Sequence, residues 1–173
     1  MEQIRNFGDE RQMTLCVYCS GVTETRDHVP SKVFLDEPYP ENLPVVPACE
    51  SCNHGFSLDE EYAACLVECA LAGSVSPESL QREKVKRILS ERPTLASRLW
   101  KADERTLSGG VSFSVELGRV RSVALKLARG HAAFELSEPQ PGEPSSVRVV
   151  PLLLMNAQEL VAQINSKLGP RKR

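Results

Sequence analysis

The sequence predicts an α+β fold, with a small metal-braced core followed by a mostly helical extension. Two C-x-x-C pairs frame a stretch rich in Pro, Gly and Asn, which is typical of loops and short strands. From residue 57 onwards, apolar residues recur at helical spacing. Of the 173 residues, 41% are hydrophobic and 25% are charged, which are ordinary values for a globular domain.

We divide the chain into three parts. Residues 1–13 form a polar lead-in, residues 14–75 form the core, and residues 76–173 form an extension of helices and short strands that we expect to position the substrate. Within the core, L-P-V-V-P-A-C (43–49) predicts a strand that leads into the second cysteine pair.

A helix is expected to follow the second cysteine pair. S-L-D-E (57–60) matches a capping box, so the helix should begin at Ser57 and end near Gly73. Cys65 and Cys69 fall on its apolar stripe, where small buried thiols are common, and we therefore assign them to the core.

The extension shows several further elements. A proline at the first helical position predicts a helix from Ser76 to about Glu91, and a second helix should carry Trp100. The remaining predicted elements are a strand over 111–117, a helix over 119–130 ending at a glycine, a strand over 145–155 and a helix over 156–168.

The cysteines Cys16, Cys19, Cys49 and Cys52 predict a structural zinc site, because two such pairs can place four thiolates at the corners of a tetrahedron. The alternative is a redox pair, which requires a C-x-x-C at a strand end within an alternating α/β pattern, and that pattern is absent. Four thiolates leave zinc no open position. Any hydrolytic chemistry must therefore lie elsewhere.

The candidates are Asp27 and His28, Asn42, and Asn53 directly after the last cysteine. The order C-x-x-C, D-H-V-P, E-N-L, C-x-x-C-N over residues 14–60 resembles the HNH endonuclease family, in the subgroup whose ββα-metal (His-Me finger) core is braced by a four-cysteine zinc. Two features depart from that pattern. Phe56 stands where many members have a lysine, and no glycine pair precedes Asn42.

The resemblance implies a role for each candidate. His28 would be the general base that activates water, and Asn42 would hold it in orientation. Asp27 and Asn53 would hold a catalytic Mg²⁺ or Mn²⁺, with His54 as the alternative to Asn53. Lys32 is a candidate phosphate contact, or simply an exposed lysine.

The expected function is therefore metal-dependent hydrolysis of phosphodiester bonds in DNA, with RNA as the alternative substrate. Two other functions stay open: a catalytically silent HNH-like zinc module for nucleic-acid binding or protein assembly, and a zinc-ribbon adaptor. Since one active site cuts one strand, a homodimer or a partner subunit is a further expectation.

Charge is distributed unevenly along the chain. Residues 1–60 contain 4 Lys/Arg and 11 Asp/Glu, whereas residues 61–173 contain 17 and 12. The basic segment 81–105 is the expected contact for a phosphate backbone. No apolar run is long enough for a membrane span, and the charged N-terminus is unlike a signal peptide. We therefore expect a cytoplasmic protein with no membrane partner.

Overall fold

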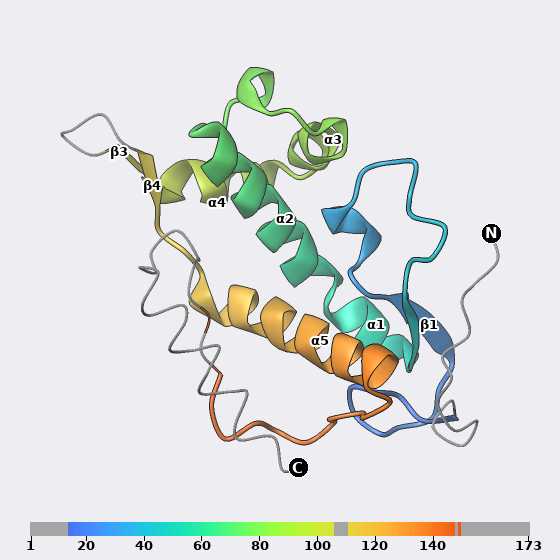
Figure 1. Ribbon diagram of the computed structural model, residues 1–173. Helices are drawn as coiled ribbons and strands as arrows, with labels where there is room; N and C mark the ends of the chain where they lie inside the picture. Colours follow the sequence, from blue (N-terminus) through green and yellow to red (C-terminus); the bar gives the residue numbers. More distant parts are fainter. Residues whose placement is uncertain (1–13, 106–110, 148, 150–173) are drawn as a thin grey trace, which may run out of the picture.

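The computed structural model describes residues 14–105, 111–147 and 149, and its elements are mixed helix and small antiparallel sheet (Figure 1). The predicted α+β class is confirmed. In chain order the elements are β1 (Thr25–His28), the 3₁₀ helix η2 (Lys32–Phe34), β2 (Val45–Ala48), α1 (Glu50–Gly55), α2 (Ser57–Ala72), the 3₁₀ helix η3 (Pro77–Ser79), α3 (Glu83–Glu91), α4 (Pro93–Ala102), β3 (Asp103–Arg105), β4 (Val111–Phe113) and α5 (Leu117–Glu135).

The first sheet joins β1 to β2 in antiparallel register, with His28 opposite Val45 and Asp27 opposite Val46. The strand predicted over 43–49 is thereby confirmed. Cys49 caps the N-terminus of α1, which follows β2 directly. The sequence therefore places the second cysteine pair at the point where a strand turns into a helix.

The long helix α2 ends at Ala72, and Gly73 takes the left-handed conformation with φ 62°, as predicted. Its predicted capping box is wrong. Phe56 is the N-cap and is helical, because α1 runs almost directly into α2 and leaves Ser57 no extended cap position. The Ser57 hydroxyl donates to the carbonyl of His54 at 2.8 Å, and Glu60 turns into the protein interior.

Two apolar cores fill the described structure. One lies between α2, α3 and α4 and includes Cys65 and Cys69, both fully buried, as predicted. The other surrounds the first cysteine pair and the β1–β2 sheet, and Ala133 of α5 belongs to it. Figure 1 shows α5 running beside α2 towards α1, so that the end of this late helix lies against the earliest part of the described chain.

Two helices of the extension differ from prediction. The segment from Ser76 forms only η3 before α3 begins at Glu83, because the Glu68 carboxylate accepts from the backbone N–H of Gln81 and Arg82 and holds the intervening chain extended. The helix expected to end at Gly130 continues to Glu135. Gly130 packs closely against the side chain of Val29, and so it does not mark a helix end.

Of the other predictions for the extension, one is confirmed, one is confirmed over a shorter range, and the rest fall mostly outside the described residues. The helix carrying Trp100 is confirmed as α4. The strand predicted over 111–117 is limited to β4, which pairs with the unpredicted β3. Residues 1–13, the helix expected over 156–168 and most of the strand expected over 145–155 lie outside the described residues.

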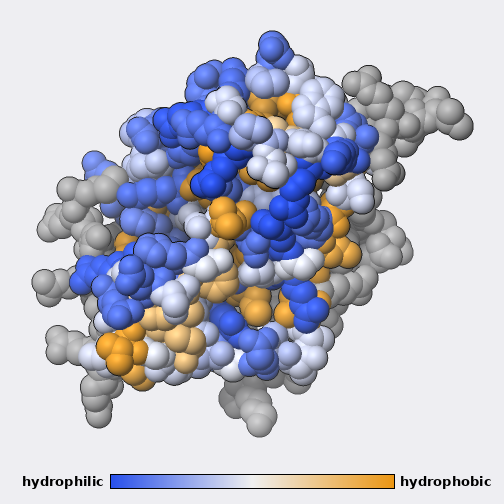
Figure 2. All heavy atoms as spheres, turned by 180° about the vertical axis from the view of Figure 1, so that it is seen from behind, coloured by the Kyte–Doolittle hydropathy of each residue, from blue (hydrophilic) through white to orange (hydrophobic). Residues whose placement is uncertain are grey.

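The surface is mixed in character. On the face shown in Figure 2, hydrophobic side chains appear in clusters among larger hydrophilic areas. Among the described residues, no helix is long and apolar enough to cross a membrane.

Candidate metal centre and the adjoining Asp27–His28 site

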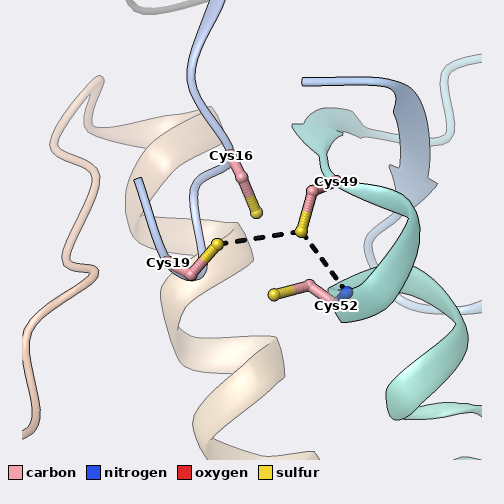
Figure 3. A group of neighbouring side chains, drawn as sticks. All are labelled: Cys16, Cys19, Cys49 and Cys52. Carbon is pink, nitrogen blue, oxygen red and sulfur yellow. Dashed lines mark hydrogen bonds between the residues drawn. The ribbon is translucent and has the colours of Figure 1, made fainter. Parts of the chain in front are cut away.

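The four predicted cysteines come together at one point, with their sulfur atoms all within 4.8 Å of one another (Figure 3). The Sγ atoms of Cys19 and Cys49 are 3.7 Å apart. A tetrahedron with Zn–S bonds of about 2.3 Å has sulfur–sulfur edges of about 3.8 Å. The cluster can therefore hold a metal ion such as zinc, as the sequence predicted.

In each cysteine pair, a backbone N–H group donates a hydrogen bond to one of the sulfur atoms. The N–H of Gly21 donates to the Sγ of Cys19, and the N–H of Cys52 donates to the Sγ of Cys49, each at 3.4 Å. Hydrogen bonds from the Ser51 hydroxyl and the Cys52 amide lower the pKa of Cys49 to about 6. Donors directed at sulfur favour the thiolate, which is the form that binds metal.

Asp27 lies beside this centre and is 5% exposed. Its Oδ2 atom accepts a hydrogen bond from the Tyr18 hydroxyl at 2.7 Å and lies 2.8 Å from the Nζ of Lys126. The same ammonium lies 2.5 Å from an oxygen of Glu60. Asp27 is thus part of a buried network that joins β1 to α2 and α5.

His28, at the end of β1, is half-buried. Burial lowers the pKa of its imidazole, and the positive charge of Lys32 lowers it further. Asp27 has the smaller, opposite effect on this pKa. The shift favours the neutral imidazole, which can accept a proton.

Asn53 and His54 of α1 point in different directions. The Asn53 side-chain amide donates to the Oγ1 of Thr25 at 3.1 Å and to the carbonyl of Arg26 at 3.3 Å. His54 is exposed and lies 3.8 Å from a carboxylate oxygen of Glu50. Of the two candidate ligands, Asn53 is the one held against the strand that carries Asp27 and His28.

Asn42 is exposed and lies in the loop before β2. Among the described residues, no hydrogen bond joins its side chain to that of His28. Asn42 lines an open groove of about 390 Å³, together with Pro30, Pro44 and Phe134 of α5. This groove lies beyond the His28 end of the β1–β2 sheet.

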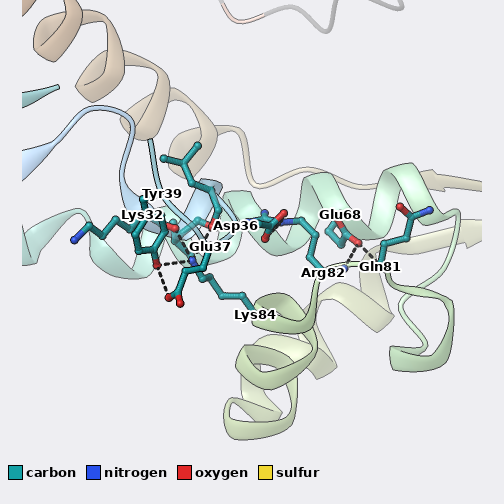
Figure 4. Close-up of polar contacts among 10 residues, drawn as sticks. Lys32, Asp36, Glu37, Tyr39, Glu68, Gln81, Arg82 and Lys84 are labelled. Atoms are coloured by element: carbon teal, nitrogen blue, oxygen red, sulfur yellow. Dashed lines mark hydrogen bonds and ion pairs between the residues drawn. The ribbon is translucent and has the colours of Figure 1, made fainter. Parts of the chain in front are cut away.

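Lys32 belongs to a loop that α3 holds in place (Figure 4). The Nζ of Lys84 donates to the carbonyls of Lys32 and Leu35 at 2.9 and 2.6 Å, and to the Tyr39 hydroxyl at 2.9 Å. Arg82 adds an ion pair with Asp36 at 2.9 Å. The amine of Lys32 itself lies 5.2 Å above the Tyr39 ring.

Many cations of the basic segment 81–105 have partners within the protein. Arg82, Lys86, Arg92 and Arg98 each form an ion pair with a carboxylate. These pairs reduce the positive charge that the segment presents to a phosphate backbone.

Sequence reasoning missed Tyr18, Glu60 and Lys126, the residues that surround Asp27. One signal was present in the sequence. Lys126 follows Val123 by three residues and precedes Ala133 by seven, so it shares the apolar face of its helix. A lysine at such a position indicates a buried ionic partner.

Comparisons of the chain with protein-family models, with curated proteins and with solved structures found no match.

Proposed function

We propose that this protein is a metal-dependent endonuclease of the HNH type that hydrolyses phosphodiester bonds in DNA. One observation carries the proposal. Asn53 is hydrogen-bonded to β1 next to Asp27 and His28, on a frame that the four cysteines fix in place. On this proposal, His28 would be the base and Asp27 and Asn53 the oxygen ligands, beside a four-cysteine cluster that could hold a structural metal ion.

The donor atoms suit a hard divalent ion. Because a carbonyl only accepts hydrogen bonds, the NH₂ group of Asn53 must face Arg26, and the amide oxygen is directed elsewhere. The contacts of Asp27 with Tyr18 and Lys126 both fall on Oδ2, so on this proposal Oδ1 would be the ligand atom. Carboxylate and amide oxygens are ligands that Mg²⁺ and Mn²⁺ accept.

His28 would act as the general base. Its lowered pKa keeps the imidazole neutral, so that it can take a proton from the attacking water. Lys32, close enough for its charge to affect His28, would attract the phosphate. The bound ion would supply the positive charge that stabilises the leaving oxygen.

A second function is favoured by a specific contact. The ammonium of Lys126 already lies against Asp27, and Asp27 is almost fully buried. A cation supplied by the chain itself is what a catalytically silent module would use in place of a divalent ion. Such a module would bind nucleic acid or assemble with proteins, and zinc would serve only its fold.

Plasmid nicking by zinc-loaded protein in buffer free of other divalent ions, before and after addition of Mg²⁺ or Mn²⁺, tests the proposal. We expect nicking only after the addition, and its loss in His28→Ala with unchanged zinc content. His131→Ala is the matched control, because His131 is on α5 and pairs with Glu135 on the surface. Mg²⁺-dependent nicking by His28→Ala at the wild-type rate would refute the assignment of His28 as the general base.

The same samples separate the two functions. Binding of DNA or RNA without cleavage under any ion condition would favour the silent module. Cleavage of RNA but not of DNA would keep the mechanism and correct the substrate.

A further inference from the structure

Three charged side chains meet in the interior where β1, α2 and α5 come together. Asp27, Glu60 and Lys126 are 5%, 4% and 2% exposed. The Nζ of Lys126 lies 2.8 Å from the Oδ2 of Asp27 and 2.5 Å from the Oε1 of Glu60. One ammonium is therefore shared by two carboxylates that come from different elements.

The formal charges of the three groups do not sum to zero. With each of them charged, two carboxylates and one ammonium leave a formal charge of −1 in a region nearly free of solvent. Burying an uncompensated charge is costly unless another cation can approach. Asp27, the proposed ligand of the divalent ion, is one of the two carboxylates that share this charge.

The contacts of Asp27 with its neighbours involve one of its two carboxylate oxygens. Lys126 and the Tyr18 hydroxyl both bind Oδ2. If Lys126 had Asp27 as its only partner, it would cancel most of the charge of that carboxylate. Because Glu60 contacts the same ammonium, Lys126 neutralises less of the Asp27 charge. The ion would therefore meet a more negative Asp27 carboxylate.

We propose that Lys126 and Glu60 together set the charge that Asp27 presents to the divalent ion, and thereby the affinity of that ion site. The inference rests on the proposed function. Both residues act as positioning residues, because they act through Asp27 and do not touch the reacting atoms.

A charge series tests this inference by Mn²⁺ binding to zinc-loaded protein, followed by isothermal titration calorimetry. Mn²⁺ is suitable because it binds thiolates much more weakly than zinc does and leaves the cysteine site intact. Glu60→Gln changes the formal charge of the network to 0, Lys126→Met changes it to −2, and the double variant restores −1. Binding measured in this way does not depend on catalysis.

The affinities should follow the charges. Glu60→Gln should weaken Mn²⁺ binding about tenfold, and Lys126→Met should strengthen it, because one unit charge near a divalent ion has a large effect in a poorly solvated site. The double variant should return to within about threefold of the wild type. Glu61→Gln is the matched control and should change nothing, because Glu61 pairs with Arg92 near the surface.

The outcomes separate the two proposals. Wild-type protein that binds no Mn²⁺ would overturn the proposed function, and this inference with it. Wild-type binding that Glu60→Gln leaves unchanged would overturn the inference alone. If circular dichroism shows that Lys126→Met does not fold, the double variant decides the matter, since it must bind Mn²⁺ more tightly than Glu60→Gln does.

Discussion

Gly130 of α5 lies directly against Val29, the residue that follows His28. A Cβ atom placed on Gly130 would stand 2.6 Å from the Cγ2 of Val29 and 2.9 Å from its Cγ1. Real Cβ contacts are not this short, so only glycine allows the helix to approach here. This close approach brings Lys126, one helical turn earlier, to Asp27.

Gly130→Ala should therefore destabilise the protein, even though alanine is the better helix former. The added methyl group overpacks the contact with Val29, which should lower the free energy of unfolding by about 1–3 kcal/mol. Urea denaturation of the zinc-loaded protein measures this. The matched control is Gly118→Ala in the same helix, because nothing lies within 4 Å of a Cβ at Gly118.

The contact can also be tested by compensation. Val29→Ala removes both methyl groups that a Cβ on Gly130 would meet. In the Val29→Ala background, Gly130→Ala should cost clearly less than it does alone, since the overpacking is relieved. Equal cost in both backgrounds would show that the two residues do not interact.

The order in which the cysteines react provides a second prediction. Cys65 and Cys69 are fully buried, and burial raises the pKa of their thiols to about 12 and about 11. At pH 8 both pKa values lie above the solution pH, so both thiols stay protonated and unreactive. Iodoacetamide labelling followed by mass spectrometry should find them unmodified in the native protein.

After chelation of the metal, the four cysteines of the cluster and the two cysteines of α2 should react under different conditions. Removing the metal exposes the thiolates of the four-cysteine cluster, which should react first. Cys65 and Cys69 should react only when the protein unfolds in denaturant. Simultaneous modification of all six cysteines after chelation would show that the α2 core depends on the metal site.

Asn53 and His54 differ in their expected contribution to ion binding. On the proposed function, Asn53→Ala removes an oxygen ligand and should raise the Mg²⁺ concentration needed for half-maximal cleavage by about tenfold or more. His54→Ala should have no such effect, because His54 is exposed and faces Glu50. The reverse pattern would make His54 the ligand, which is the alternative that the sequence left open.

Lys84 should stabilise the loop that carries Lys32. Its ammonium has three hydrogen-bond acceptors in that loop, which matches its full number of donors. Lys84→Met should cost about 2 kcal/mol in stability and increase hydrogen exchange over residues 32–39. Lys86→Met is the control, because Lys86 pairs only with Glu83 on its own helix; equal exchange in both variants would contradict the prediction.

Local patterns predicted much of the core. The spacing of the cysteines predicted the cluster, and L-P-V-V-P-A-C predicted β2, because each signal lies within a few residues of the chain. The end of α2 at Gly73 was predicted for the same reason. The roles of Asp27 and His28 as a nuclease dyad remain a proposal from the resemblance.

Local patterns also misled where distant contacts competed with them. The capping box at Ser57 was wrong because α1 runs almost directly into α2, and Glu60 pairs with Lys126, 66 residues away, instead of capping the helix. Gly130 looked like a helix end, but the structure uses it for a close approach to Val29. In both cases the local pattern was read without a contact that only the folded chain supplies.

The sequence by itself determined which residues can bind metal, since ligand chemistry and close spacing are local properties. The tertiary structure alone decided what surrounds Asp27. Tyr18, Glu60 and Lys126 come from separate segments, and their meeting depends on how α2 and α5 pack against the part of the chain that carries the four-cysteine cluster. No periodicity along the chain specifies which buried lysine meets which buried carboxylate, because that pairing is a property of the packed interior.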